Sequence, residues 1–205
     1  MKFKICGMRD FDNIKEISVL HPDYMGFIFW DKSSRYVNKS TLKLPKIIKK
    51  TGVFVDASID FIKKSIKVHE LQAVQLHGKE TPEYCDLINQ LEVETIKAFS
   101  IQDSFNFKKL KPYERFCDFY LFDTKGKLPG GNGFKFNWEV LKNYPDKKPF
   151  FLSGGIGLEN VKEIQKLSNT DLPIYAIDVN SKFESTPGIK KIKELSQFKK
   201  ELYEL

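Results

Sequence analysis

Cysteine and histidine are scarce in this sequence, and neither forms a recognisable cluster. The three cysteines, Cys6, Cys85 and Cys117, are far apart, and no CxxC pair occurs. An odd number of widely spaced cysteines predicts neither a disulfide framework nor a thiolate metal site. His69 and His77 lie eight residues apart with no thiol or carboxylate at ligand spacing, so we expect no metal.

Long apolar runs are absent as well. No segment approaches the roughly 20 apolar residues that a membrane helix needs. Charged residues interrupt residues 1–20, where a signal peptide would need an apolar run. We therefore expect a cytoplasmic protein without a membrane partner.

Charged and aromatic residues, by contrast, are abundant. Of the 205 residues, 41% are hydrophobic and 30% are charged, and the chain holds 18 Phe and 8 Tyr. This composition is typical of a globular protein and unlike that of a disordered chain. The length suits one large core, so we expect a single domain over residues 1–205.

Basic residues outnumber acidic residues by 34 to 27, which gives a net charge of +7. Such an excess is compatible with an anionic small ligand or with nucleic acid. The lysines occur in scattered pairs, such as Lys49 and Lys50 or Lys190 and Lys191, rather than in one stripe with aromatic residues. This distribution favours a solvated lysine-rich surface, and we expect no nucleic-acid partner.

Eight short apolar runs alternate with amphipathic stretches along the chain. Runs such as GFIFW, GVFV and IYAID are rich in β-branched and aromatic residues, as are strands covered on both faces. Successive runs are 22 to 31 residues apart, which leaves room for a strand, a helix and two loops. The pattern predicts a single (β/α)8 barrel, with a doubly wound open sheet as the alternative. The runs centre on Lys4, Phe27, Val53, Gln75, Lys97, Tyr120, Phe151 and Ala176.

Apolar residues at helical spacing predict helices between these runs. Ile59, Ile62 and Ile66 form one stripe behind Ser58, which is a candidate helix cap. Two later stripes repeat every third residue, which is close to the helical period. They comprise Leu158, Val161, Ile164 and Leu167, and then Ile189, Ile192, Leu195 and Phe198.

Polar residues or glycines follow most of the predicted strands, at the end of a (β/α)8 barrel where active sites lie. Gly154 and Gly155 precede a predicted helix, whose free N–H groups favour an anion. In many such barrels the loops after strands 7 and 8 hold phosphate, so we predict a phosphate site at these glycines. The other candidates at strand ends are Cys6, Arg35, His77, Asp123 and Asp178.

Eight segments in a fixed order span nearly the whole chain. They are KICG at 4–7, SSRYV at 33–37, GVFV at 52–55, QLHGKE at 75–80, LFDT at 121–124, GGNGFKFNW at 130–138, SGGIGLENV at 153–161 and IDVNSKFESTPGIKK at 177–191. The ordered set resembles the phosphoribosylanthranilate isomerase family. That resemblance implies a (β/α)8 barrel that works without a cofactor in tryptophan biosynthesis. Its reaction would be the Amadori rearrangement of N-(5-phosphoribosyl)anthranilate to 1-(2-carboxyphenylamino)-1-deoxyribulose 5-phosphate.

The resemblance also implies roles for the candidate residues. The rearrangement needs an acid at the furanose ring oxygen and a base at C2, and by analogy Asp123 is the acid and Cys6 the base. Arg35 would bind the anthranilate carboxylate through its guanidinium, and His77 would bind the substrate or orient its neighbours. The remaining assignments are Asp178 to the substrate, and Gly154, Gly155, Asn180 and Ser181 to the phosphate. The partner would be this small-molecule substrate, and the chain would act as a monomer or a homodimer.

One departure and two alternative functions stay open. Lys182 and Phe183 are bulkier than the residues that the family has there, and Lys182 becomes a candidate phosphate ligand. An aminoaldose isomerase of histidine biosynthesis is the alternative enzyme, although its acid and base would be aspartates at strands 1 and 5, whereas strand 1 here ends in Cys6. A non-catalytic basic barrel that binds nucleic acid is the third interpretation, and the scattered lysines argue against it.

Overall fold

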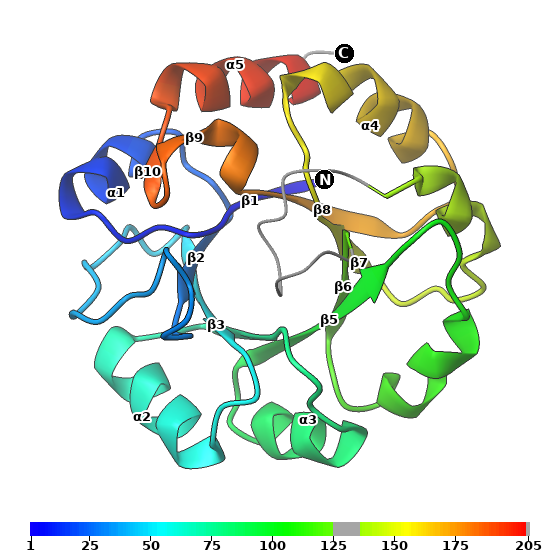
Figure 1. Cartoon of the computed structure of the whole chain (residues 1–205), viewed down its shortest axis with the longest axis horizontal. Coiled ribbons are helices and arrows are strands. Elements are labelled where there is room, and N and C mark those ends of the chain that lie inside the picture. Colours follow the sequence, from blue (N-terminus) through cyan, green and yellow to red (C-terminus); the bar gives the residue numbers. More distant parts are fainter. Residues whose placement is uncertain (125–135, 204–205) are drawn as a thin grey trace.

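Eight parallel strands close into a barrel in the computed structural model of the chain, which describes residues 1–124 and 136–203 (Figure 1). The strands are β1 (Lys2–Ile5), β2 (Tyr24–Ile28), β3 (Lys49–Phe54), β4 (Ala73–Leu76), β5 (Glu94–Ile101), β6 (Phe119–Thr124), β7 (Phe150–Leu152) and β8 (Ile174–Val179). Strands that follow each other in sequence are neighbours, and β8 pairs with β1 to complete the ring. The predicted (β/α)8 barrel is confirmed, and the centre of each predicted apolar run lies in one strand.

An apolar layer fills the barrel interior below the polar strand ends. Tyr24 of β2 and Phe151 of β7 meet edge to face at 5.3 Å between ring centroids, although their strands are not neighbours. The layer comprises Tyr24, Ala73, Ile96, Ala98, Leu121, Phe151 and Ala176. Because side chains of a strand alternate between its two faces, residues two positions further on point into the same interior, nearer to the carboxyl ends. Those residues include Gln75, Asp123, Ser153 and Asp178.

Helices cover the outside of the barrel, and side-chain caps mark where several of them begin (Figure 1). Ser58 accepts a hydrogen bond from the amide of Phe61 and caps α2 (Ile59–His69), as predicted. Asp10 and Thr81 cap α1 (Phe11–Ser18) and α3 (Pro82–Asn89) in the same way. Further along lie α4 (Val161–Ser168), α5 (Ile192–Tyr203) and the 3-10 helices η1 (Phe107–Tyr113), η2 (Trp138–Asn143), η3 (Leu158–Asn160) and η4 (Ser181–Phe183). In the described part of the chain, no helix is long and apolar enough to cross a membrane.

Three crossovers differ from the expected run of α-helices. Residues 29–48, all described, join β2 to β3 without an α-helix, because this segment lacks an apolar stripe at helical spacing. The helices η1 and η2 are of the tighter 3-10 type where α-helices were expected. Pro112 lies inside η1, and a proline has no N–H to donate to an α-helical ladder.

A small hairpin, β9 (Glu184–Thr186) with β10 (Ile189–Lys190), follows η4 and precedes α5. Gly188 has a φ of +90°, which allows the turn between the two strands. Ile189, which the sequence placed on the stripe of the last helix, therefore lies in a strand, and α5 begins at Ile192. Asn13 of α1 exchanges hydrogen bonds of 2.9 and 2.7 Å with the backbone of Lys190, so the hairpin is anchored beside the barrel mouth.

Candidate active site

A cavity opens at the carboxyl ends of the barrel strands. It encloses about 690 Å³ including its open mouth. Its apolar wall includes Trp30, Val53 and Ile156, and its polar wall includes charged and hydroxyl side chains. This mixture suits a ligand that combines an apolar ring with several polar groups.

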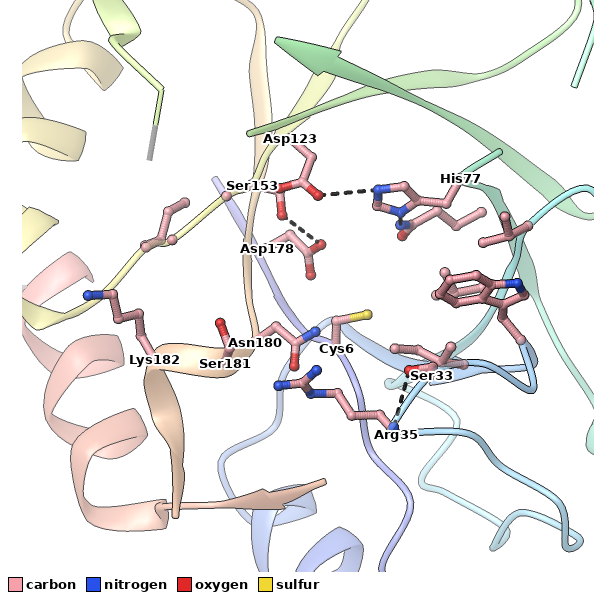
Figure 2. A pocket seen from close by; sticks show the side chains of 18 residues that line it. Cys6, Ser33, Arg35, His77, Asp123, Ser153, Asp178, Asn180, Ser181 and Lys182 are labelled. Carbon is pink, nitrogen blue, oxygen red and sulfur yellow. Dashed lines mark hydrogen bonds and ion pairs between the residues drawn. The ribbon is translucent and has the colours of Figure 1, made fainter. Parts of the chain in front are cut away.

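Every candidate site residue from the sequence lines this cavity (Figure 2). The barrel gathers them from the ends of five strands and from the loop after β2. Their shared location is compatible with one site but assigns a role to none of them. They are Cys6, Arg35, His77, Asp123, Gly154, Gly155, Asp178, Asn180 and Ser181.

Cys6 directly follows β1 and is buried at the inner wall. Its amide donates to the carbonyl oxygen of Val179 at 2.9 Å. An added Cβ at Gly26 would come within 2.6 Å of the Cys6 Sγ, so glycine at that position makes room for the thiol. Burial raises the pKa of Cys6, although the positive charges of Lys4 and Lys190 oppose the rise. The free site therefore holds a protonated thiol at neutral pH.

Lys4 lies two residues before Cys6 and points into the same interior. Its fully buried ammonium donates to Asp178 Oδ1 at 2.9 Å and to Gln75 Oε1 at 2.8 Å. Burial opposes the charged form of Lys4, but Asp178 and Cys6 outweigh burial and raise the pKa of Lys4. Burial also raises the pKa of Asp178, against the influence of Lys4, and Asp178 Oδ2 accepts from Ser153 Oγ at 3.2 Å. Lys4 is therefore an ammonium group at neutral pH.

Asp123 and His77 face each other at the upper side of the cavity in Figure 2. Nε2 of His77 lies 3.2 Å from Oδ2 of Asp123, and the two side chains are 9% and 6% exposed. The amide of Thr124 donates to Asp123 Oδ1 at 2.9 Å, and Nδ1 of His77 lies 2.7 Å from Nε2 of Gln75. Within the described residues, no hydrogen bond of good geometry reaches His77 Nε2, a buried nitrogen that faces Asp123 Oδ2.

Arg35 lies in the loop after β2 and forms an ion pair with Glu184 of the hairpin. Nε of Arg35 donates to the two carboxylate oxygens at 2.9 and 3.0 Å, and Nη2 donates to Oε2 at 2.5 Å. Lys190 donates to Glu184 Oε1 at 2.7 Å and to the side chain of Asn180 at 2.7 Å. Burial alone would raise the pKa of Glu184, but Arg35 and Lys190 lower it. Glu184 is therefore an anion between two cations, and the cluster has a net charge of about +1.

The loops after β7 and β8 form the side of the cavity where phosphate was predicted. Gly154 and Gly155 have φ angles of +95° and +62°, a region that L-residues rarely adopt. An added Cβ at Gly154 would also collide with Thr124, so both the backbone angle and the lack of space require glycine there. On the facing loop, Lys182 lies 3.6 Å from Glu159 between Nζ and Oε1, and both side chains are partly exposed.

Several side chains at this site were not among the candidates, including Gln75, Ser153, Glu184 and Lys190. Gln75 could have been found from the sequence, because side chains two positions apart in a strand point to the same face and Gln75 lies two residues before His77. Ser153 begins the SGG segment and carries a similar signal. Glu184 and Lys190 belong to a hairpin that the sequence did not predict, so no pattern pointed to them.

No three His, Cys, Asp or Glu side chains within residues 1–124 and 136–203 gather as metal ligands would. Residues 130–135, which belong to the GGNGFKFNW segment and include Asn132, lie outside the described residues.

Comparison with known proteins gives a consistent set of relatives. The family model described as "N-(5'phosphoribosyl)anthranilate (PRA) isomerase" matches residues 3–201. The N-(5'-phosphoribosyl)anthranilate isomerase of Parabacteroides distasonis is 39% identical over 205 aligned residues, which cover 97% of this chain and 91% of the relative.

Solved structures agree with the sequence relatives. The phosphoribosyl anthranilate isomerase of Thermus thermophilus superposes with a TM-score of 0.85 at 25% identity, and the match covers 98% of each chain. A phosphoribosyl anthranilate isomerase in complex with reduced 1-(o-carboxyphenylamino)-1-deoxyribulose 5-phosphate superposes with a TM-score of 0.80 at 29% identity, and the match covers 100% of each chain.

Proposed function

The chain belongs to the N-(5'-phosphoribosyl)anthranilate isomerase family, and from this membership we propose its substrate, its chemistry and the role of each site residue. The reaction is the rearrangement of N-(5-phosphoribosyl)anthranilate to 1-(2-carboxyphenylamino)-1-deoxyribulose 5-phosphate, a step of tryptophan biosynthesis. The complex of a relative with a reduced form of that product supports this assignment.

One observation carries the proposal for the chemistry: a thiol and a carboxyl group flank the loops proposed to hold the phosphate. Strands β6, β7, β8 and β1 are consecutive around the ring. Asp123 is the last residue but one of the first of these strands, and Cys6 follows the last. The glycine loop and the Asn180–Ser181 segment follow the two strands between them. A sugar held by its phosphate in the middle would thus present different atoms to a group on each side.

Asp123 acts as the acid and Cys6 as the base. The carboxyl group of Asp123 gives its proton to the furanose oxygen, the C1–O bond breaks, and the ring opens to an iminium ion. The Cys6 thiolate then removes the proton from C2, and the electron pair neutralises the iminium to give an enolamine. Tautomerisation of the enolamine yields the ketone product, so protons and electrons balance without a redox partner.

The protonation state of Cys6 is the most demanding part of this scheme. Burial raises the pKa of the thiol in the free site, so the thiolate is a minor species at neutral pH. Lys4 and Lys190 are the two cations whose charges favour it. Their role in the reaction is therefore to lower the free energy needed to form the thiolate.

Arg35 binds the carboxylate of the anthranilate ring. Glu184 occupies Nε and Nη2 of the guanidinium, which leaves Nη1 as the nitrogen without a hydrogen bond inside the described chain. A carboxylate at Nη1 would complete the set of donors that a guanidinium offers. The apolar residues Trp30 and Ile28 line the same cavity and supply a surface for the aromatic ring.

Phosphate binds between the loops after β7 and β8, with Gly154, Gly155, Asn180 and Ser181 as its nearest residues. Asp178 orients the site by holding Lys4 and Ser153, rather than by meeting the phosphate itself. Lys182 reaches the phosphate when it leaves Glu159, a contact that is weak in water because both side chains are exposed.

Fluorescence of the anthranilate group tests the proposed activity. Freshly generated phosphoribosylanthranilate is mixed with the protein, with Cys6→Ser and with Cys85→Ser, and the decay of fluorescence is followed. Cys85 is a buried helix residue outside the cavity and serves as a matched thiol control. Fast decay with wild type and Cys85→Ser but not with Cys6→Ser supports the proposal. No decay above the spontaneous rate with wild type would reject the activity.

A further inference from the structure

A chain of three side chains crosses the floor of the cavity from Lys4 to His77. Lys4 Nζ donates to Gln75 Oε1 at 2.8 Å, and Gln75 Nε2 lies 2.7 Å from His77 Nδ1. Lys4 is fully buried and Gln75 is 1% exposed, so water does not compete for these contacts. Each link therefore has to be satisfied by the next side chain.

The chemistry of the lysine sets the direction of every hydrogen bond in this chain. An ammonium group has three donors and no acceptor, so the atom of Gln75 that meets Lys4 must be the carbonyl oxygen. The NH2 group of Gln75 then has to face His77, and it can only donate. Nδ1 of His77 must accept this hydrogen bond, so the imidazole carries its proton on Nε2.

Two further contacts of Lys4 keep the donor-to-acceptor direction of these hydrogen bonds from reversing. Asp178 also binds Lys4, at 2.9 Å, and together with Cys6 it raises the pKa of the lysine above the ordinary value, so the donor at the start of the chain stays charged. A flipped Gln75 amide would turn its NH2 group toward that ammonium and leave two buried donors face to face. Such an unsatisfied arrangement costs more than a typical hydrogen bond contributes.

We propose that Gln75 is a positioning residue that fixes His77 in the tautomer with its proton on Nε2. This nitrogen lies 3.2 Å from Asp123 Oδ2 and has no hydrogen bond of good geometry within the described chain. His77 thus presents an N–H donor to the carboxylate that forms when Asp123 gives up its proton, or to a substrate oxygen beside it. The other tautomer would present a lone pair to that carboxylate and repel it.

The tautomer follows from the free protein alone, whereas its effect on turnover rests on the proposed function. A general acid works better when its conjugate base is stabilised by a donor that is already in place. The amide of Thr124 provides one such donor at Asp123 Oδ1. His77 Nε2–H lies 3.2 Å from Oδ2, without a hydrogen bond of good geometry in the free protein, and would provide the second donor once Asp123 has given up its proton. Gln75 therefore contributes to catalysis through His77 without touching the substrate.

Nitrogen NMR of the wild-type protein tests the tautomer directly. The chain has three histidines, and in ¹⁵N-histidine-labelled protein the signals of His77 are identified by their loss in His77→Gln. We expect a protonated Nε2 and an unprotonated Nδ1 for His77 near neutral pH. A protonated Nδ1 in the wild-type protein would overturn the proposal, whether or not any variant folds.

Gln75→Met tests the positioning role, with Gln72→Met as its matched control. Methionine keeps the shape of Gln75 but cannot orient the imidazole, and Lys4 keeps Asp178 as a partner. Gln72 lies just before the same strand and does not line the cavity, and its side chain accepts a hydrogen bond from the amide of Lys50 at 2.7 Å. We expect Gln75→Met to show a mixture of His77 tautomers and a kcat about 10-fold lower, with KM within about 2-fold of wild type.

The control separates this effect from a general loss of stability. Gln72→Met should keep the single His77 tautomer and the wild-type kcat. A single Nε2–H tautomer and an unchanged kcat in Gln75→Met would overturn the proposal. If the wild-type protein lacked isomerase activity but showed the expected tautomer, the proposed function would fail while the assignment of the His77 proton to Gln75 would stand.

Discussion

Arg35 and Glu184 form a bidentate ion pair at the cavity wall although 149 positions separate them in the chain. The side chains are 13% and 4% exposed, so solvent screens the pair only weakly. The contact joins the loop after β2 to the hairpin after β8, on opposite sides of β1. It holds the guanidinium in place in the free protein, which would lower the entropic cost of binding the proposed substrate carboxylate.

Glu184→Gln should weaken substrate binding more than it slows turnover. The substitution leaves Arg35 and Lys190 as two close cations without their shared anion, so the guanidinium loses its fixed position. We expect KM to rise by about 10-fold or more with a smaller change in kcat. We also expect the free energy of unfolding to fall by about 3 kcal/mol, because one partner of a buried ion pair is removed.

Steady-state kinetics and urea denaturation measure both effects. Glu139→Gln is the matched control, because Glu139 pairs with Lys142 on the surface, where the two side chains are 67% and 63% exposed. It should leave KM unchanged and should change the unfolding free energy by no more than about 1 kcal/mol. An unchanged KM in Glu184→Gln would show that Arg35 needs no partner to bind its ligand.

Cys6→Ser and Asp123→Asn should each lower kcat by roughly 100-fold to 10,000-fold, the usual contribution of one general acid or base. Serine is too weak an acid to form the alkoxide that would replace the thiolate, and asparagine has no proton to give at the ring oxygen. KM should change little, because the proposed phosphate and carboxylate contacts remain. Wild-type turnover in either variant would remove that residue from the mechanism.

Alkylation of Cys6 should be slow at neutral pH and should accelerate as pH rises. Burial raises the pKa of Cys6, and only the thiolate reacts with iodoacetamide, so the rate should increase about 10-fold per pH unit below that pKa. Cys85 and Cys117 are internal controls, because burial raises the pKa of each thiol to about 12. Mass spectrometry of the labelled peptides would report all three rates. Rapid, pH-independent labelling of Cys6 at neutral pH would show that the thiol is already ionised.

The barrel and the place of its site could be predicted because their signals are local. Strands covered on both faces give continuous apolar runs, and active sites of this fold lie at the carboxyl ends of the strands, so Cys6 and Asp123 could be placed at one mouth. The segment from residue 29 to residue 48 could not be predicted in the same way. It lacks a helical period, and its contacts include a bridge between Ile28 and Tyr36 and the ion pair of Arg35 with Glu184, which no local pattern indicates.

The contacts that orient the site were beyond the sequence, because they join residues that no periodicity links. Nothing in the local sequence of Glu184 indicates that it would bind Arg35, and the helical spacing of Ile189 with later residues hid the hairpin that carries it. The direction of the hydrogen bonds from Lys4 through Gln75 to His77 likewise depends on two strands, β1 and β4, that are not neighbours in the barrel. Tertiary packing decides such contacts, and local propensity does not.

Lys182→Ala should raise KM by about 3-fold to 10-fold and leave kcat close to wild type, since a partly exposed lysine adds modest attraction to a phosphate. Lys182 lines the cavity, and its present partner Glu159 lies 3.6 Å away at the surface. The effect should shrink as salt is added, because screening weakens exposed charge pairs. Lys142→Ala, a change at a surface lysine far from the cavity lining, serves as control. An unchanged KM in Lys182→Ala would exclude this lysine as a phosphate ligand.

Lys190 should make the protein more stable as pH rises above about 8. Burial lowers the pKa of Lys190 from 10.5 to about 8, despite the attraction of Glu184. Below pH 8 both the folded and the unfolded chain carry the proton, and the penalty for burying the charge is fully present. Between about pH 8 and 10.5 the unfolded chain binds the proton more strongly, so the free energy of unfolding rises with pH.

Urea denaturation across this pH range, compared between wild type and Lys190→Met, isolates the contribution. The unfolding free energy of wild type should gain about 3 kcal/mol relative to the variant between the lower and the upper end of the range. Lys191→Met removes a partly exposed lysine one position away and keeps Lys190, so it should follow the wild-type curve. Parallel curves for wild type and Lys190→Met would mean that Lys190 keeps its ordinary affinity for the proton. Lys190 would then stay a cation beside Cys6 across this pH range and would favour the thiolate throughout it.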